Sequence, residues 1–421
     1  LTCSTWKIIE TVLQRKFESL ASLDSMLNEF AIGNRKCQFF TRIPGRQDAN
    51  MFDFDALFLF GVPLMIKVAL EMPTLFAEKT VPLLLDGDNK SVSLTRRQCA
   101  CLLAHSFFGS ITKKSIVQGS TKLWSFNVSE LFFLESVPSA LCFLNYFKVL
   151  GQEWEHSGER AFWDEKVIVE RVGFSRAVGT PWKWENNPKP LVHVRFASSE
   201  DHIEDSDADT HVDFANRFVG GGCTTGDTHM EEILFLIKPE LMVARILSSY
   251  MQDEEAIRIR GALQFSTYAG FASTFKFVGD YKGGHTDSQP TVLAIDALQM
   301  NKVQFKVVRR DLDKARLAFD GARIVATGNW GCGAFGNDFI LKFLQQWMAA
   351  SDADVSELVY HTFGHRKAEP LPRIAGSLQS LKVGELWNCV RDASEVASNV
   401  FPPPMQKIEF LKQINMATKL L

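Results

Sequence analysis

The fold of this chain is decided by the stretch Val212-Asp213-Phe214-Ala215-Asn216-Arg217-Phe218-Val219-Gly220-Gly221-Gly222, which is followed closely by Glu231-Glu232. Helix or strand stability does not explain consecutive glycines, because each glycine costs about 0.5–1 kcal/mol inside such an element. They suit a loop that lets a ligand lie against bare backbone. Glu231 and Glu232 then open an apolar run over residues 233–237, which predicts a helix whose start points toward whatever the loop holds.

The paired acids suit glycosidic chemistry. A carboxyl can protonate the oxygen of a leaving sugar and later take a proton from the attacking water. Adjacent carboxyls also raise one another's pKa, which would keep one of them available as an acid near neutral pH. The helix dipole alone favours acids in a first turn, so capping is the alternative reading of Glu231 and Glu232. Asp213 ends a strand-like run and is either a strand-end cap or a third acid of the site.

A second glycine-rich segment, Gly331-Cys332-Gly333-Ala334-Phe335-Gly336, follows a strand-like run at 323–326 and precedes an amphipathic run at 338–350. Glycines let the backbone turn tightly, and the helix start offers unpaired N–H groups to an anion. The spacing also matches the G-x-G-x-x-G dinucleotide fingerprint. That fingerprint requires an acid after the next strand, and residues 361–365 contain none. We therefore favour a diphosphate loop, with a nicotinamide site and a purely structural turn as alternatives.

The organisation of the chain changes near residue 150. Residues 1–145 show helical spacing, for example at 5–27 and 94–108, and predict a helical accessory domain. Residues 146–421 alternate short strand-like runs with helices at 231–249 and 338–350, which predicts an α/β layer architecture. The strand-like runs are 166–172, 191–196, 211–214, 291–295, 323–326 and 358–362. Residues 198–209 and 279–289 read as acidic surface loops, and the tail from residue 401 as extended chain followed by a short helix.

Composition restricts the classes of function. With 46% hydrophobic residues and a net charge of −3, the chain can form large cores but is not suited to coating a polyanion over a long track. Its 8 cysteines are scattered, which predicts no disulfide framework or zinc ribbon and favours a reducing compartment. The apolar stretch 52–70 is interrupted by Asp55, Pro63 and Lys67 and predicts a core helix rather than a membrane span. Because the chain begins at Leu1, we expect targeting segments to have been removed.

Other candidate sites are weaker. His361 and His365 are four residues apart, but a strand-like run and Gly364 disfavour a helical metal pair. Cys332 lies inside a tight glycine loop and reads as packed rather than nucleophilic. The basic run at 306–316 alternates with acids, which predicts a solvated helix face rather than a nucleic-acid patch.

Together the two glycine loops resemble those of poly(ADP-ribose) glycohydrolases of the animal type. The family's signature joins a triple glycine to a Gln-Glu-Glu triplet, which residues 212–222 with Glu231-Glu232 closely resemble, and residues 326–336 resemble the family's second glycine loop. Weaker similarity continues at Ile203-Glu204, at 268–271 and at 360–364, and the helical part is similar near 81–84 and 102–108. The resemblance therefore spans most of the chain. It implies a macrodomain-like mixed sheet flanked by helices, with an N-terminal helical accessory domain.

The resemblance also implies roles for individual residues. Glu232 would protonate the leaving ribose oxygen and then activate water, while Glu231 and Asp213 would hold and orient the riboses. The implied substrate-binding residues are Asn216 on a ribose, Gly220, Gly221 and Gly222 at the first loop, Asn329, Gly333, Ala334 and Phe335 at the diphosphate, Ile203 and Glu204 at the adenine edge, Phe363 on the adenine face, and Phe271 over the substrate.

The implied activity is hydrolysis of ribose–ribose bonds in poly(ADP-ribose) with release of ADP-ribose, and the alternative is a module that binds the polymer without cleaving it. We expect no metal or cofactor, no membrane association, no sequence-specific nucleic-acid contact, a monomer, and an intracellular role in the DNA damage response in nucleus or cytoplasm. Two residues depart from the family pattern. Met230 stands where the family has glutamine, and Phe271 where it has a tyrosine, so an amide and a phenol hydroxyl are lost while the proton-transfer groups are kept.

Overall fold

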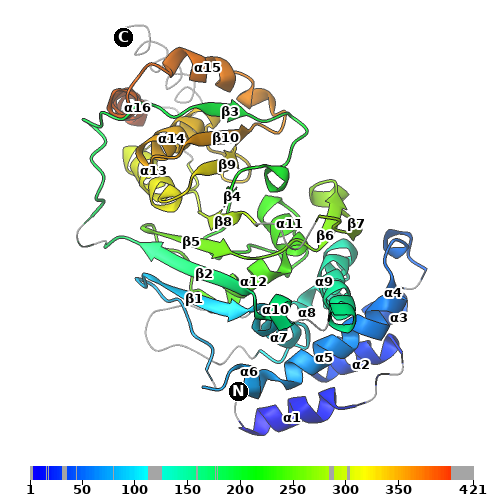
Figure 1. Ribbon diagram of the computed structural model, residues 1–421. Helices are drawn as coiled ribbons and strands as arrows, with labels where there is room; N and C mark the ends of the chain where they lie inside the picture. The colour runs from blue at the N-terminus through cyan, green and yellow to red at the C-terminus, as the bar shows by residue number, and fades with distance from the viewer. Residues whose placement is uncertain are drawn as a thin grey trace.

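The computed structural model describes residues 3–399 except 16, 18, 31–35, 44, 79, 112–125, 158–159, 176, 178, 284–288 and 301–303. An 8-stranded mixed sheet runs through the molecule in the order β1-β2-β5-β8-β4-β9-β10-β3 (Figure 1). The strands are β1 (Lys90–Thr95), β2 (Lys166–Gly173), β5 (Glu255–Arg260), β8 (Thr291–Ala294), β4 (Thr210–Asp213), β9 (Ile324–Gly328), β10 (Glu357–His361) and β3 (Val194–Phe196). From β1 to β8 the pairs are antiparallel, and from β8 to β3 they are parallel.

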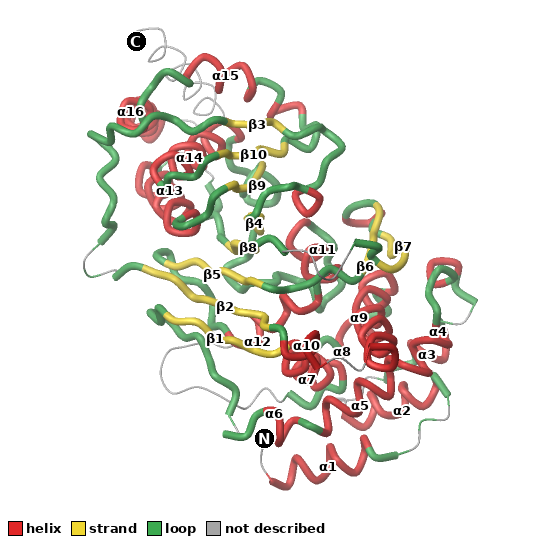
Figure 2. Tube along the Cα trace, viewed as in Figure 1, coloured by secondary structure: helices red, strands yellow, loops and turns green. Residues whose placement is uncertain are grey.

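Helices cover both faces of the sheet (Figure 2). On one face lie α13 (Phe305–Phe319), α14 (Phe339–Asp352) and α16 (Val383–Asn399), and on the other lie α11 (Met230–Ile237) and α12 (Met242–Leu247). Alternate residues of one strand enter different cores: Val292 and Ala294 join the core on the α11 side, and Leu293 joins the core on the α13 side. A sheet buried on both faces explains the nearly continuous apolar strands, and it confirms the predicted α/β class.

The N-terminal part is helical and packs on the edge of the sheet nearest β1. Its helices are α1 (Cys3–Leu13), α2 (Ala21–Phe30), α3 (Phe39–Arg42), α4 (Phe54–Ala56), α5 (Val62–Leu70), α6 (Met72–Leu75), α7 (Arg96–Phe107), α8 (Ser129–Phe133), α9 (Val137–Ser157) and α10 (Arg160–Asp164). The side chain of Thr95 accepts a hydrogen bond from the N–H of Gln98, and the Gln98 side chain accepts one from the N–H of Thr95. This capping box starts α7 at Arg96, two residues after the predicted start at residue 94, because β1 extends to Thr95. The apolar stretch 52–70 is helical as predicted, with a π-helical turn over Leu57–Gly61.

Several sequence predictions need correction. The helical reading of the N-terminal part misses β1, and the strand-like runs miss β5 as well as the hairpin β6 (Ser266–Ala269) and β7 (Lys276–Asp280). The predicted helix at 231–249 breaks after α11, because Pro239 cannot donate an N–H to continue it. The acidic segment 279–289 was predicted as a loop, but its first residues, through Asp280, belong to β7. The tail from 401 lies outside the described residues.

The predicted solvated face of residues 306–316 is wrong. These residues belong to α13, and Asp311 and Lys314 are fully buried there because each has an oppositely charged partner on a neighbouring element. Separately, α9 runs through residue 145, where we predicted a boundary; the division into 1–145 and 146–421 stays a prediction. The last described helices are α15 (Leu371–Leu378) and α16. Among the residues described, no helix is long and apolar enough to cross a bilayer.

Candidate active site

The candidate active site lies where the parallel strands β4, β9 and β10 end. The loops that follow these strands carry residues 214–222, 329–336 and 362–365, and together with the start of α11 they enclose a pocket of about 740 Å³. Ligands of open α/β sheets bind at this carboxyl edge, and the volume is within the usual range of about 300–1,000 Å³ for ligand pockets. The loops that contain the two glycine segments therefore meet at one cavity, the first loop through residues 214–216 and the second through residues 329–335.

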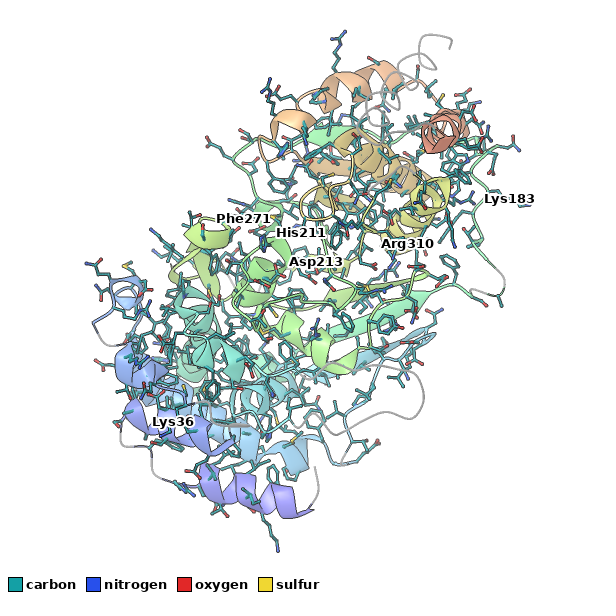
Figure 3. All side chains as sticks on the ribbon, turned by 180° about the vertical axis from the view of Figure 1, so that it is seen from behind. Lys36, Lys183, His211, Asp213, Phe271 and Arg310 are labelled. Atoms are coloured by element: carbon teal, nitrogen blue, oxygen red, sulfur yellow. The ribbon has the colours of Figure 1, made fainter. Side chains whose placement is uncertain are left out.

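Most of the sequence-predicted site residues line this pocket. They are Glu204, Asn216, Glu231, Glu232, Phe271, Asn329, Gly333, Ala334, Phe335 and Phe363. Ile203, Asp213, Gly220, Gly221 and Gly222 are not among its lining residues. Figure 3 shows Asp213 and His211 in the interior and Phe271 on the projecting turn between β6 and β7.

The first glycine loop holds the two glutamates through its backbone. Glu231 accepts hydrogen bonds from the N–H of Asn216 at 2.8 Å and from the N–H of Gly220 at 2.5 Å. Glu232 accepts one from the N–H of Gly222 at 2.9 Å, through Oε1. The N–H groups of this loop are thus used to fix carboxylates of the protein. Glu231 has both oxygens held, so it is the more rigid of the pair.

Gly221 is required by close approach. Its φ is +45°, and a Cβ at this position would lie 2.2 Å from Oε1 of Glu232 and 2.6 Å from Oε2 of Glu231. Any side chain would displace both carboxylates. The central glycine of the triplet therefore lets the backbone touch the acids.

Asp213 completes a buried cluster of acids. It is 2% exposed, and neither of its carboxyl oxygens has a hydrogen-bond partner among the described residues. Burial, and then the charge of Glu232, raise the pKa of Asp213 well above its usual range. Burial also raises the pKa of Glu231, with Asp213 and Glu232 adding to the shift and the two backbone N–H groups opposing it. The cluster therefore retains protons that isolated carboxyls would lose.

Arg245 supports the first glycine loop from behind. Its Nη1 donates to the carbonyl oxygens of Phe218, at 2.5 Å, and Val219, at 3.0 Å. Its guanidinium also lies over the Phe218 ring, 5.5 Å from the centroid. An arginine of α12 thus fixes the carbonyls just before the glycines, whose N–H groups fix Glu231.

The second glycine loop is shaped differently. It closes on itself through the N–H of Gly336 to the carbonyl of Gly333, at 3.0 Å, and the side chain of Asn337 donates to Gly331 and Leu298 at 2.9 and 3.0 Å. Asp338 caps α14 by accepting from the N–H groups of Ile340 and Leu341, as the strand-to-helix pattern predicts. Among the described residues, no acceptor takes the N–H groups of Gly333, Ala334 or Phe335.

A network of buried charges includes Lys342, which lies under the second loop. Lys342 is fully buried, pairs with Asp311 at 2.7 Å and lies 3.5 Å from the ring centroid of Trp330. Asp311 is also paired with Arg310 at 2.9 Å, and Arg310 pairs with Asp296 at 2.7 Å. Lys314 pairs with Asp296 as well. Asp253 also pairs with Arg310, at 3.2 Å, so this network holds three cations and three acids, and Lys342 is the cation that lies next to the loop.

A further part of the site carries the residues that the family resemblance places at an adenine. Ile203 and Glu204 form a short 3-10 turn, and the hydroxyl of Tyr268 donates to Glu204 Oε1. Phe363 has a φ of +51°, an uncommon value for a bulky residue, and lies near the His361 ring at 5.9 Å in a stacked arrangement. Such strain is typical of functional positions.

Phe271 and His229 form the rim. Phe271 is 47% exposed, and the ring of His229 meets it edge-on at 5.6 Å. The backbones behind them are joined, because the N–H of Ala272 donates to the carbonyl of Thr228 and the Thr228 hydroxyl donates to the carbonyl of Ala272, both at 2.8 Å. The rim thus ties the β6–β7 turn to the start of α11.

Sequence reasoning assigned no role to the supporting residues Arg245, Lys342, Asn337, Tyr268 and His229. Tyr268 lies in the segment 268–271, where the resemblance was seen, and Asn337, next to the second glycine loop, and His229, two residues before Glu231, had a positional signal. Among the described residues, no group of three or more His, Cys, Asp or Glu side chains could hold a metal. The seven cysteines whose side chains are described are all buried and unpaired with one another.

Fold and site together are compatible with an enzyme of the glycosidase class, because a mixed α/β sheet presents two pocket-lining carboxyls beside a glycine loop. The family profile for the macro domain fold of poly(ADP-ribose) glycohydrolase (PARG) matches residues 181–370, and the profile for the helical domain of the same enzyme matches residues 37–171. This chain belongs to the poly(ADP-ribose) glycohydrolase family and is a hydrolase of glycosidic bonds.

Similar proteins come from plants and nematodes. A protein of Arabidopsis thaliana described as "probable poly(ADP-ribose) glycohydrolase 2" is 27% identical over 88% of this chain and 83% of its own length. Poly(ADP-ribose) glycohydrolase 2 of Caenorhabditis elegans is 32% identical over 66% of this chain and 59% of its own length, so the chain spans less than two thirds of that protein. Among solved structures, the glycohydrolase of Thermomonospora curvata with the inhibitor ADP-HPD is 14% identical over 44% of this chain and 79% of that chain, with a TM-score of 0.28.

Proposed function

We propose that this chain hydrolyses the ribose–ribose bonds of poly(ADP-ribose), releases ADP-ribose, and uses Glu232 as its general acid and base. The observation that carries this proposal is the geometry of the glutamate pair. Both carboxylates line the pocket, but Glu231 is held through both oxygens and Glu232 through Oε1 only. The oxygen Oε2 of Glu232 remains for substrate.

The pocket accommodates one terminal ADP-ribose in a single orientation. The diphosphate lies at the free N–H groups of Gly333, Ala334 and Phe335, above the buried Lys342. The adenine lies between Glu204 and Phe363, and Asn329 stands beside the second glycine loop, with its amide donating to the carbonyl of Thr362 at 2.9 Å. The distal ribose then lies at Asn216, Glu231 and Glu232.

The reaction follows from this placement. Glu232 gives its proton to the ribose oxygen of the leaving unit as the bond from that oxygen to the anomeric carbon breaks. The anomeric carbon passes through an oxocarbenium-like state, which the nearby diphosphate of the substrate and the negative charge left on Glu232 stabilise. Water attacks that carbon, and Glu232 takes the proton of the water, which restores the starting state. Glu231 orients the ribose hydroxyls.

Asp213 acts through its neighbours rather than on the substrate. It is buried behind the glutamates, and its raised pKa means that it holds a proton at pH values where a free aspartate is charged. A neutral Asp213 limits the negative charge next to Glu232. We therefore assign to Asp213 the maintenance of protonation in the acid cluster, in place of a direct ribose contact.

The two departures from the family affect the rim more than the reaction. Met230 is partly buried and packs against a small core that contains Ile203 and Val359. An apolar thioether fits this contact without burying an unpaired polar group. Phe271 keeps an exposed ring for stacking but offers no hydroxyl. We propose that the protein acts as a monomer on polymer attached to other proteins, inside the cell in nucleus or cytoplasm, as part of the DNA damage response; fractionation of cells with and without DNA breaks tests the compartment.

The experiment that tests the activity uses polymer made by an auto-modified polymerase. The wild-type chain is expected to shorten the polymer and release free ADP-ribose, identified by chromatography, and to bind ADP-ribose in calorimetry. Glu232→Gln, which keeps the size of the side chain, is expected to bind ADP-ribose and release none. Binding by the wild type without any release would establish a polymer-binding module instead.

A further inference from the structure

The 3-10 turn Ile203–Asp205 is attached to the main sheet by two buried histidines. His211 of β4 donates from Nε2 to the carbonyl of Ser206, and His361 of β10 donates from Nδ1 to the carbonyl of Asp201, both at 3.2 Å. Each histidine is 1% exposed. The two bonds therefore fix the chain just outside both ends of the turn.

The turn has little other polar attachment to the sheet. Its own backbone bonds are local, because the N–H of Asp205 donates to the carbonyl of His202 and the N–H of Ser206 to that of Ile203, at 3.2 and 3.0 Å. Ile203 packs into a small apolar core. Among the described residues, the two histidines make the only hydrogen bonds from strands of the main sheet to residues 201–206. The position of the turn thus depends on them.

The register of the sheet directs both rings to the turn. Val212 and Tyr360, which are next to the histidines along the strands, belong to the core on the α13 face. Because side chains alternate along a strand, His211 and His361 point to the opposite face, and Figure 3 shows His211 in the interior. The strands β4 and β10 lie on either side of β9. A turn that crosses β9 is therefore held from both sides.

Both rings are kept in the neutral form. Burial, and then the charge of Lys238, lower the pKa of His211 to about 3, and burial lowers the pKa of His361. A neutral ring has a single N–H, and here the chain at the turn accepts it. The other ring nitrogens, Nδ1 of His211 and Nε2 of His361, are buried without a partner among the described residues. The one donor of each ring is thus committed to holding the turn.

The placement of the turn matters because Glu204 lines the catalytic pocket. Its Oε1 accepts a hydrogen bond from the hydroxyl of Tyr268, which leaves Oε2 for a ligand. The ring of His361 also stacks near that of Phe363, with centroids 5.9 Å apart. His361 therefore joins the turn to the aromatic ring on which the proposed function places the adenine.

We propose that His211 and His361 are positioning residues for adenine recognition: by holding the turn, they place the Glu204 carboxylate at the 6-amino group of the base. The proposal rests on the proposed function, which places the adenine between Glu204 and Phe363. Neither histidine is among the residues that line the pocket, so both act through the turn. A carboxylate accepts from an amino group, but it has no proton to give to the oxygen of a 6-oxo base.

The test compares the binding of ADP-ribose with that of its 6-oxo analogue, inosine diphosphate ribose, by calorimetry. In the wild type we expect the analogue to bind on the order of tenfold more weakly. His211→Leu and His361→Leu are expected to raise the Kd for ADP-ribose on the order of tenfold and to change that for the analogue little, so that the ratio falls toward one. On polymer, KM should rise while kcat is kept, because the first glycine loop still holds Glu232.

Conservative variants separate the hydrogen bond from the ring. His211→Gln keeps an N–H near the position of Nε2, and His361→Asn keeps one near Nδ1, so each is expected to retain most of the discrimination that the Leu variant loses. If a Leu variant does not fold by circular dichroism, His211→Asn and His361→Gln, which displace the donor, replace it and are expected to lose the discrimination.

His105→Leu is the matched control. His105 lies in α7, is also 1% exposed, and its Nε2 bonds to the carbonyl of Ala69 at 3.0 Å, away from the pocket. This variant is expected to lower stability but to keep the ratio of the two Kd values and the KM for polymer.

The outcomes separate this proposal from the proposed function. A wild-type ratio in both donor-lacking variants, or an equal loss in His105→Leu, would overturn the positioning role and leave the catalytic pocket in place. Equal binding of the two ligands by the wild type would instead contradict the placement of the adenine at Glu204, and this proposal with it.

Discussion

The two glycine loops use the same residue type in opposite ways. In the first loop the N–H groups of Gly220 and Gly222 are already bound to Glu231 and Glu232. In the second loop the N–H groups of Gly333, Ala334 and Phe335 have no acceptor among the described residues, and the buried Lys342 lies below. One loop therefore positions the protein's own acids, and the other is prepared for an anion that the substrate brings. Glycine-rich sequence alone does not distinguish these roles; the residues packed behind each loop do.

The largest effect is expected from adding one methyl group to the first loop. Gly221→Ala would place Cβ within 2.2 Å of Glu232 and would strain a φ of +45°. Displacement of a catalytic group by about 1 Å costs on the order of 10²-fold in rate, so we expect kcat to fall by at least that factor. The control is Gly333→Ala in the second loop, where a Cβ meets nothing within 4 Å. Equal losses in the two variants would contradict the assigned roles.

The role of the second loop is tested by removing the buried cation beneath it. Lys342→Met removes the cation next to Trp330, and we expect the Kd for ADP-ribose to rise on the order of tenfold with little change in kcat. Lys314→Met removes another fully buried lysine of the same network, paired with Asp296 and without a described contact to the loop. Both variants lower stability, so calorimetry is done at a temperature where circular dichroism shows both to be folded. An equal rise in Kd would mean that Lys342 acts only on stability.

Stability against pH tests the acid cluster. Because the pKa of Asp213 is raised in the fold, the folded state binds the proton more tightly than the unfolded state. Its contribution to stability is therefore complete below the unfolded pKa of about 3.9 and is lost as pH rises through the folded pKa. Asp213→Asn removes this loss, so we expect the variant to be more stable than the wild type near pH 8, on the order of 1–3 kcal/mol. The difference should shrink toward pH 4.

Denaturant unfolding across this pH range provides the measurement. Asp296→Asn provides the opposite case: burial alone would raise the pKa of Asp296, but Lys314 and Arg310 outweigh it and hold that pKa below its usual range. That variant should lose stability near pH 8. If Asp213→Asn is also less stable than the wild type near pH 8, the folded state does not raise the pKa of Asp213, and the account of the acid cluster is wrong.

The smallest effect is expected at the rim. Phe271→Tyr restores the hydroxyl that the family usually has and keeps the ring, so we expect ADP-ribose to bind two- to tenfold more tightly, the value of one net hydrogen bond of about 0.5–1.5 kcal/mol. Phe271→Leu keeps an apolar group without a ring and is expected to weaken binding. A change of kcat without a change of affinity in Phe271→Tyr would show that the ring acts in the reaction and not at the rim.

The sequence predicts the parts of this site that are local. Three consecutive glycines around Gly221 disfavour both helix and strand and so predict a loop. Glu231 and Glu232 stand at the start of a run with helical apolar spacing. Asp338 caps α14 where the pattern places it. Sequence patterns predict those strands of the sheet that are short, apolar and alternate with helices. This pattern can be recognised because it involves only residues that are close together along the chain.

What the sequence could not show are contacts between distant elements. Arg245 sits among apolar residues of α12, and Lys342 among those of α14, and nothing in their neighbours shows that each supports a glycine loop. The run 306–316 looked solvated because its charges alternate along the chain, yet Lys314 pairs with Asp296 and Asp311 pairs with Lys342, both outside the run. Pro138 of α9 and Ser273 of the turn after β6 line one surface cavity, a juxtaposition that only tertiary packing creates.

The most direct test of the central claim is a single-turnover measurement of ADP-ribose release from short polymer, with wild type, Glu231→Gln and Glu232→Gln side by side. Loss of a general acid costs about 10²–10⁴-fold, so Glu232→Gln should show the largest loss of the rate constant while still binding ADP-ribose. Glu231→Gln should lose less, because a glutamine can still orient a ribose. Wild-type release by Glu232→Gln would contradict the assignment of Glu232 and, with it, the reading of the first loop as the holder of the catalytic acid.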